Sequence, residues 1–256
     1  MPELPEVETV VRTVAPRLRG RRIVEVRVFS KKAWAVSVAK ARGQRVRDVR
    51  RYGKYILLEL ERGLLAIHLG MTGKLAANAA AGPYTRAVLV LDRGEIVFDD
   101  VRQFGSVRWL DREPAHLGPD ALAVSADEFI ERLAARRTRI KALLLNQSFV
   151  RGIGNIYADE SLFRARIHPL AIAARLSRPR GRRLHAAIVE VLTEAIARGG
   201  SSISDYVDAD GRPGWFQLLH RVYQKTGEPC SVCGAPIRRI LVAQRATHYC
   251  PRCQRA

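Results

Sequence analysis

The first apolar residues of the chain repeat at the spacing of an α-helix. They stand at i, i+3, i+4, i+7 and i+11, as Val7, Val10, Val11, Val14 and Leu18. Such a pattern buries one face of a helix. Pro5 suits a position in the first turn of this helix, and Gly20 follows the last helical residues. The sequence therefore predicts that the chain opens with an amphipathic helix.

From there to about residue 110, the pattern changes to short runs of alternating apolar and polar residues. β-Branched residues are frequent in them, and turns such as Asp92-Arg93-Gly94 separate them, as is typical of strands. The runs are Arg22–Val28, Arg45–Arg50, Lys54–Leu60, Leu64–Leu69, Arg86–Leu91, Glu95–Phe98 and Ser106–Leu110. With the first helix they predict an antiparallel sandwich or barrel in a domain over residues 1–112.

Helical periodicity begins again after a Pro- and Gly-containing linker at residues 113–124. Ser125 and Glu128 form a capping box that starts a helical domain, which we place at 125–220. The helical patterns cover Glu128–Ala135, Thr138–Asn146, Asn155–Arg166 and Gly181–Arg198. A glycine turn precedes Asn155, which is positioned as an N-cap. Two helices around a short glycine turn form either a DNA-backbone reader or a hairpin without a ligand.

The composition adds a strong positive charge. The 256 residues include 44 Lys and Arg against 25 Asp and Glu, a formal net charge of +19. Because 47% of the residues are hydrophobic, we expect this charge on a folded surface and not on a disordered tail. Such a surface attracts polyanions, most often nucleic acid, although a generally basic proteome would give the same charge.

Neither a membrane span nor a signal peptide is evident in the sequence. The longest stretches without a charged residue have 11 residues, at 63–73 and 75–85, whereas a membrane helix needs about 20. The N-terminus carries Glu3, Glu6 and Glu8 in place of an apolar signal segment. We therefore expect a cytoplasmic protein with no membrane partner.

All four cysteines lie near the C-terminus as two CxxC pairs. Cys230 and Cys233 are separated by 16 residues from Cys250 and Cys253. At this spacing, two tight turns can present four thiolates to one tetrahedral ion. The sequence predicts a structural Zn²⁺ with no open coordination position, in a basic zinc finger at 221–256 that suits nucleic acid.

The N-terminus offers a nucleophile. Removal of Met1 would leave Pro2 with a secondary amine beside the carboxylate of Glu3. Such an amine can attack an aldehyde-level carbon and form an iminium, which is an electron sink. A terminal amine, with a pKa of about 7.7 to 8.0, is far less protonated near neutral pH than a lysine at about 10.4. Pro-Glu is also an ordinary lead-in to a helix, so these two residues leave both interpretations open.

Taken together, these features resemble the formamidopyrimidine-DNA glycosylases, bacterial base-excision enzymes that remove oxidised purines. The resemblance covers nearly the whole chain and rests on residues 2–9, 51–55, 68–73, 100–105, 152–158, 199–202 and 244–247. In the sister endonuclease VIII-like family, which takes oxidised pyrimidines, the opening resembles Pro-Glu-Gly-Pro-Glu. Leu4 therefore favours the purine branch.

The resemblance implies four catalytic residues. Pro2 would attack C1′ of the damaged nucleotide and expel the base through a Schiff base, and Glu3 would act as general acid and base on the sugar. Lys54, on a predicted strand, would contact phosphate and assist β-elimination. Arg245 would bind phosphate and serve the later δ-elimination.

It also implies DNA contacts around a nucleotide turned out of the helix. Met71, Arg102 and Phe104 would fill the space that the nucleotide leaves, although Met71 and Phe104 would otherwise be read as core. Asn155 would bind the backbone at a helix N-terminus. A basic cluster would either face DNA or form a solvated surface; it comprises Arg136, Arg137, Arg139 and Lys141.

The remaining implied sites are supporting ones. Glu6 would stabilise the catalytic site, and His68 would make a weak phosphate contact. A lid over the everted base would span residues 201–214 and include Ser204, Asp205 and Tyr206. The sequence departs from the family at Pro83-Tyr84, where a Lys-His pair is usual, so that Tyr84 would have to replace the phosphate contact of that His.

The sequence thus predicts an α+β multidomain protein with a β-sandwich, a helix-two-turn-helix domain and a zinc hairpin. It would act as a monomeric bifunctional DNA glycosylase and abasic-site lyase on double-stranded DNA that contains a damaged base. One alternative is an endonuclease VIII-like enzyme for oxidised pyrimidines. The other is a non-catalytic zinc-containing DNA-binding protein, which would need the cysteines and the basic surface but not Pro2-Glu3.

Overall fold

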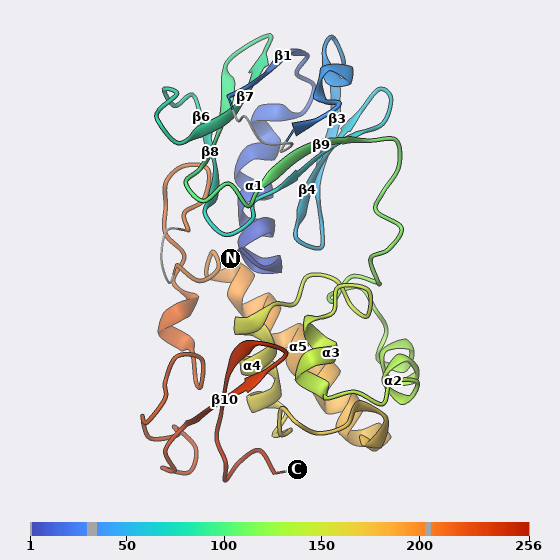
Figure 1. Ribbon diagram of the computed structural model, residues 1–256, viewed down its shortest axis with the longest axis vertical. Coiled ribbons are helices and arrows are strands. Elements are labelled where there is room, and N and C mark those ends of the chain that lie inside the picture. The colour runs from blue at the N-terminus through green and yellow to red at the C-terminus, as the bar shows by residue number, and fades with distance from the viewer. Residues whose placement is uncertain (1, 30–34, 203–205, 256) are drawn as a thin grey trace. The chain divides into compact units, whose positions relative to one another are not determined.

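The computed structural model describes residues 2–29, 35–202 and 206–255 (Figure 1). The chain forms two compact units. The first consists of residues 1–115 and 196–217, and the second of residues 116–195 and 218–256. The segment 201–214, expected as a lid, therefore groups with the unit that the N-terminal residues build.

The first unit is a β-sandwich with one long helix, α1 (Leu4–Leu18). One sheet has the strand order β1-β7-β8-β6 and the other β2-β9-β5-β4-β3. The strands are β1 (Ile23–Val28), β2 (Ala35–Val36), β3 (Val46–Tyr52), β4 (Tyr55–Leu60), β5 (Leu64–His68), β6 (Gly73–Ala77), β7 (Thr85–Leu91), β8 (Glu95–Asp100) and β9 (Ser106–Leu110). A 3-10 turn, η1 (Val38–Ala41), follows β2.

Helix α1 supplies much of the core of this unit. In Figure 1 it runs between the two sheets, and its apolar stripe packs in one cluster with side chains of both. Val7, Val14 and Leu18 are fully buried. The expected helix and the β-sandwich are therefore confirmed. The helix residues that pack against the sheets are those that the spacing of apolar residues predicted to be buried.

Three local predictions in this unit were wrong. Strand β2 was missed; it has only two residues. Strand β6 was missed because its sequence, Gly-Lys-Leu-Ala-Ala, has no β-branched or aromatic residue. Lys54 was expected on a strand but lies with Gly53 in the two-residue turn between β3 and β4. Gly53 takes a positive φ of 62°, as such a hairpin turn requires.

The second unit contains four helices and a β-hairpin. Helices α2 (Ala126–Ala134), α3 (Ile140–Leu145), α4 (Asn155–Arg164) and α5 (Arg178–Ala197) correspond to the four predicted helical patterns. Short 3-10 turns occur at η2 (Ala173–Arg175) and η3 (Phe216–Leu219). The Ser125 hydroxyl caps α2 by accepting from the N–H of Glu128. At α4 the N-cap is Gly154, so the expectation of Asn155 as the cap was wrong by one residue.

The zinc hairpin consists of β10 (Arg238–Val242) and β11 (Arg245–Tyr249), which pair antiparallel. Ile237 and Cys250, next to the hairpin strands, form an apolar cluster with Cys230, with Val222 and with Phe163 of α4. The fold class is thereby confirmed: a sandwich with a helix, a helix-two-turn-helix region and a C-terminal hairpin. In the part of the chain that the structure describes, no helix has the length and hydropathy to cross a membrane.

Candidate functional site

The start of α1 is built around two buried carboxylates. Pro2 is buried, Glu3 is 3% exposed and Glu6 is 2% exposed. The Glu6 side chain accepts the N–H of Glu3 at 2.8 Å through one oxygen and the N–H of Ser201 at 2.8 Å through the other. One carboxylate therefore joins the residue after Pro2 to a segment almost 200 residues later in the chain.

The segment that meets Glu6 comes close because it contains glycine. Gly200 has a φ of 82°, and a Cβ there would lie 2.7 Å from a carboxylate oxygen of Glu6. The hydroxyl of Tyr206 donates to the backbone oxygen of Glu6 at 3.2 Å. Burial, together with the charge of Glu6, raises the pKa of Tyr206, so this phenol remains a neutral donor. Ser204 and Asp205 of the expected lid lie outside the described residues.

Lys54, in the turn between β3 and β4, lies close enough to His68 of β5 for its charge to act on the ring. Tyr55 is paired with His68 across β4 and β5, and Lys54 is 8% exposed. Burial, and then the charges of Lys54 and Arg108, lower the pKa of His68 to about 4. Its Nδ1 accepts the N–H of Gly70 at 3.1 Å. His68 is therefore a neutral ring at physiological pH whose Nε2 carries the proton.

Two loops carry the residues expected to fill the space left by a nucleotide. Residues 69–72 lead from β5 to β6 and residues 101–105 from β8 to β9, and we call them the insertion loops. Each crosses between the sheets. The strand pairs His68 with Ser106 and Gly73 with Asp100 bring their ends together. The structure thus places two sequence-distant loops side by side.

The insertion loops touch through backbone and present exposed side chains. A Cβ on Gly70, whose φ is 61°, would lie 2.4 Å from the carbonyl carbon of Phe104. Met71 is 38% exposed and Phe104 57%. The Arg102 guanidinium lies 4.9 Å above the Phe104 ring, within cation–π range. Exposure of an aromatic ring, a thioether and a cation together fits a surface that inserts into a ligand better than it fits core packing.

Tyr84 lies at the edge of the same surface. Its side chain is 52% exposed and its backbone oxygen accepts the N–H of Asp100 at 2.9 Å. Asp100 is the last residue before the second insertion loop. The residue that departs from the family pattern is therefore fixed beside the residues expected to contact DNA.

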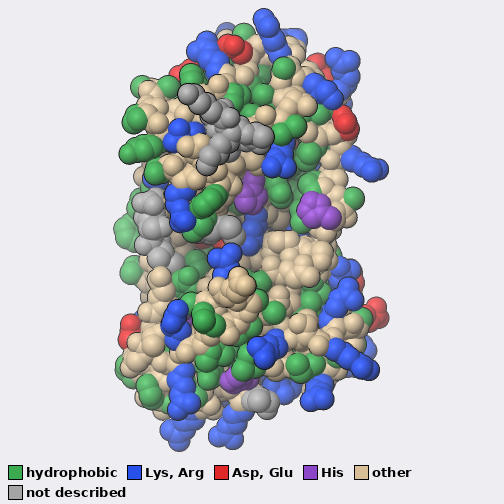
Figure 2. Space-filling view, viewed as in Figure 1, with side chains coloured by type: hydrophobic (Ala, Val, Ile, Leu, Met, Phe, Trp, Pro, Cys, Tyr) green, Lys and Arg blue, Asp and Glu red, His purple; other side chains and the backbone are tan. Residues whose placement is uncertain are grey.

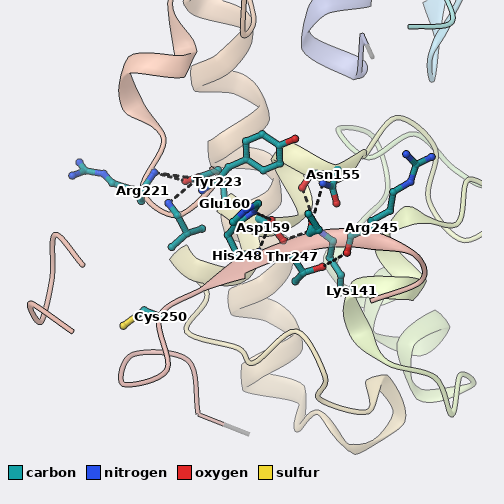
Figure 3. A network of polar contacts seen from close by, with 12 residues as sticks. Lys141, Asn155, Asp159, Glu160, Arg221, Tyr223, Arg245, Thr247, His248 and Cys250 are labelled. Carbon is teal, nitrogen blue, oxygen red and sulfur yellow. Dashed lines mark hydrogen bonds and ion pairs between the residues drawn. The ribbon is translucent and has the colours of Figure 1, made fainter. Parts of the chain in front are cut away.

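In the second unit, Asn155 and the zinc hairpin come together (Figure 3). The side-chain amide of Asn155, in the first turn of α4, donates to the backbone oxygen of Ala246 at 2.9 Å. The neighbouring Arg245 is exposed, and Figure 3 shows its side chain pointing away from the network. The Oδ1 atom of Asn155 is buried without a hydrogen-bond partner among the described residues. A helix N-terminus and an arginine thus lie at one edge of the hairpin, which suits a phosphate.

Lys141 does not belong to an exposed basic cluster, contrary to expectation. It is fully buried, and its ammonium donates to Asp159 at 2.5 Å and to the backbone oxygen of Asn155 at 3.1 Å. The other Asp159 oxygen accepts the backbone N–H of His248 at 2.9 Å and lies 3.1 Å from its ring. A buried ammonium cannot reach DNA and here balances a buried carboxylate. Arg136, Arg137 and Arg139 are exposed, as expected.

Glu160 ties the same helix to the chain before the hairpin. Its carboxylate accepts the backbone N–H groups of Arg221, Val222 and Tyr223 at 2.9 to 3.1 Å. Burial raises the pKa of the Glu160 carboxyl, and these N–H groups oppose that shift because they favour its charged form. Sequence reasoning missed Asp159, Glu160 and His248. The one available signal was the position of the two acids inside a helix otherwise rich in buried residues.

The four cysteines fit a zinc ion. Their sulfur atoms all lie within 4.8 Å of one another, with 3.9 Å between Cys230 and Cys253 and 3.4 Å between Cys233 and Cys250. A tetrahedron with Zn–S bonds of about 2.3 Å has edges of about 3.8 Å. The N–H groups of Val232 and Cys253 point at cysteine sulfurs at 3.4 Å, which favours thiolates. The predicted four-cysteine zinc site is confirmed.

The molecular surface is strongly basic. On the face seen in Figure 2, Lys and Arg side chains are spread widely and acidic ones are few. This distribution agrees with the net charge of +19 and with a polyanionic partner. A β-sandwich with exposed insertion loops, a helix-two-turn-helix region and a four-thiolate finger together define a zinc-containing class of DNA-binding protein.

Comparisons with known proteins define the class further. Family models match three successive parts: the formamidopyrimidine-DNA glycosylase N-terminal domain at residues 1–107, the H2TH domain of the same enzymes at 117–207, and a zinc finger found in FPG and IleRS at 227–256. The chain is 54% identical to the formamidopyrimidine-DNA glycosylase of Solibacter usitatus and 45% identical to that of Variovorax paradoxus, each over the full length of both proteins.

Solved structures show the same similarity. The MutM (FPG) protein of Thermus thermophilus matches with a TM-score of 0.92 at 43% identity, over 99% of this chain and 98% of that one. A Lactococcus lactis FPG mutant in complex with Fapy-dG-containing DNA matches with a TM-score of 0.90 at 35% identity, over all of both chains. The chain belongs to the formamidopyrimidine-DNA glycosylase family.

Proposed function

We propose that Pro2 is the nucleophile of a DNA glycosylase and abasic-site lyase that removes oxidised purines from double-stranded DNA. Glycosylase and lyase activity is the activity of the family to which the chain belongs. The observation that carries the residue assignment is the position of Pro2 directly before the N-cap residue of α1, next to the buried carboxylates of Glu3 and Glu6.

The chemistry follows from this amine. After Met1 is removed, the Pro2 nitrogen attacks C1′, the glycosidic bond breaks, and its electron pair leaves with the base, which takes up a proton. Glu3 moves protons on the sugar as it opens. The resulting iminium accepts electrons when a C2′ proton is lost, and the 3′ phosphate departs in β-elimination assisted by Lys54. A second elimination, served by Arg245, expels the 5′ phosphate and leaves a one-nucleotide gap.

Residues of each unit are assigned to DNA contacts. Met71, Arg102 and Phe104 fill the space of the everted nucleotide, with Arg102 hydrogen-bonded to the orphaned cytosine. Other residues contact the backbone, and we assign this role to Tyr84, Asn155, Arg245, Arg136 and, as a neutral donor, His68. Tyr206 belongs to the lid, with Ser204 and Asp205. Glu6 supports the site by joining the Pro2 end of α1 to Ser201.

Four further assignments complete the proposal. The domains are the catalytic sandwich at 1–112, a linker at 113–124, the helical domain at 125–220 and the zinc finger at 221–256. The zinc ion is structural because its four thiolates leave no coordination position open. The protein acts as a monomer. It is placed in the bacterial cytoplasm, in association with the nucleoid, because its substrate is there.

Borohydride trapping tests the nucleophile. Reduction of the iminium should give a covalent adduct with duplexes that carry 8-oxoguanine or a formamidopyrimidine, and the adduct should disappear in Pro2→Gly. A duplex with thymine glycol is the specificity control. Trapping with thymine glycol alone would instead favour an endonuclease VIII-like enzyme. Tight binding without any adduct would leave only a DNA-binding protein.

A further inference from the structure

Asp100 lies at the junction of the insertion loops, and the chemistry proposed above does not use it. It is the last residue of β8 and is fully buried. A carboxylate without exposure to water is retained only where hydrogen-bond donors surround it. The groups that satisfy Asp100 therefore indicate what it does.

Each side-chain oxygen of Asp100 holds one insertion loop. The hydroxyl of Thr72 donates to Oδ1 at 2.6 Å, and the N–H of Gly105 donates to Oδ2 at 2.7 Å. Thr72 follows Met71, and Gly105 follows Phe104. The Thr72 hydroxyl in turn accepts the backbone N–H of Arg102 at 3.1 Å. All three proposed space-filling residues are thus within one residue of a hydrogen bond in this network.

The backbone of Asp100 adds two more connections. Its N–H donates to the oxygen of Tyr84 at 2.9 Å, and its oxygen accepts the Arg86 guanidinium at 2.8 Å. Its side chain and backbone therefore bond to both insertion loops and to the segment of Tyr84. A carboxylate fits this position because both of its oxygens accept, whereas an amide would turn an N–H toward one of the two donors.

We propose that Asp100 is a positioning residue that holds Met71, Arg102 and Phe104 at one fixed spacing so that they enter the DNA as a single unit. This inference rests on the proposed function of those three residues. Fixing the loops before binding removes the entropy cost of ordering them when a nucleotide leaves the stack. Asp100 acts through the loops and does not touch the reacting sugar.

The chain provides a matched control. The neighbouring Asp99 accepts the hydroxyl of Thr85 at 2.6 Å, the same kind of bond at the same distance as that between Thr72 and Asp100. Thr85 lies outside both insertion loops. The test variants are therefore Asp100→Asn and the milder Thr72→Val, with Asp99→Asn as control and Thr72→Ser as rescue. Thermal unfolding of each variant identifies any that fail to fold.

Two readouts on the full-length protein separate positioning from general damage. The first is single-turnover excision of 8-oxoguanine opposite cytosine, with 2-aminopurine beside the lesion to report loss of stacking. The second is strand cleavage at a preformed abasic site, where no base has to be unstacked. We expect Asp100→Asn to lower the rate of excision, and the rate at which the 2-aminopurine signal changes, by about 10- to 100-fold. Abasic-site cleavage should change by less than about threefold, and Thr72→Ser should behave as the wild type.

Each outcome bears on the proposal. Equal losses on both substrates, or equal losses in Asp99→Asn and Asp100→Asn, would overturn it in favour of a structural role. Unchanged excision in folded Asp100→Asn and Thr72→Val would also overturn it. Phe104→Ala separates this failure from that of the proposed function. If Phe104→Ala leaves excision unchanged, the space-filling assignment itself is wrong.

Discussion

Both units expose residues proposed to contact DNA, and a buried carboxylate supports each set. The two carboxylates connect different kinds of structural element. In the first unit, Asp100 connects loops whose flanking strands already pair through their backbones. In the second unit, Asp159 of α4 accepts a hydrogen bond from His248 of β11, which lies 89 residues later in the chain. The same carboxylate accepts from the ammonium of Lys141 on α3. Glu160 makes a comparable link to residues 221–223.

The difference reflects how much apolar core surrounds the insertion loops and the zinc hairpin. The sandwich packs around α1, so the register of its strands already fixes where the insertion loops emerge. The zinc hairpin has only a small apolar cluster and depends on a metal and on buried polar bonds for its position. Changes at the zinc ligands and at the buried polar bonds that hold the hairpin should therefore affect stability more than changes at the insertion loops.

Cys250→Ser should give the largest effect because binding of structural zinc supplies about 10 kcal/mol or more. We expect the zinc content, measured by metal analysis, to fall together with DNA binding and δ-elimination. Ser231→Ala, between the first two cysteines, is the control and should keep the metal. If Cys250→Ser retained δ-elimination without zinc, the placement of Arg245 in the reaction would be wrong.

Lys141→Met should come next. Removing one partner of a fully buried pair leaves Asp159 without its counter-charge, which typically costs about 3 to 5 kcal/mol. Urea unfolding of the full chain measures this loss. The exposed Arg137→Met should change the unfolding free energy by less than about 0.5 kcal/mol. A loss of unfolding free energy below about 1 kcal/mol in Lys141→Met would mean that the pair of Lys141 and Asp159 stabilises the fold no more than an exposed ion pair does.

The smallest effect concerns pH and the first unit. The pKa of His68 is about 4 in the fold and about 6.5 in the unfolded chain, so the unfolded state binds more protons between these values. Stability is then full above pH 6.5 and falls as the pH decreases toward 4, by about 3 kcal/mol at most. His68→Asn, which keeps an acceptor for Gly70, should flatten the unfolding free energy over this window. An unchanged slope would show that His68 does not titrate there.

The sequence predicted those parts of the fold that depend on regular spacing. The apolar stripe of α1 and the two CxxC pairs are local patterns, and both are present as expected. It failed where tertiary contacts decide. Lys141 looked like part of a basic surface because its partner Asp159 is 18 residues away, although Ile140 and Leu144 beside it already indicated a buried helix face.

The candidate site shows the same division. Motifs in the sequence pointed to Met71, Arg102 and Phe104, but not to the way in which two loops 30 residues apart are held together. The role of Asp100 depends on strand register and on which donors surround it, and neither can be deduced from one sequence. Likewise, no local pattern relates Glu6 to Ser201, which are 195 residues apart.

The turn of the zinc hairpin has a consequence for protein engineering. Ala243 and Gln244 both adopt left-handed backbone conformations, with φ of 48° and 58°, where Asn-Gly is the usual choice. Each such residue costs about 1 kcal/mol. A search for thermostable variants would therefore select changes at these two positions early. Arg245 follows directly, so the easiest gain in stability lies where activity has the most to lose.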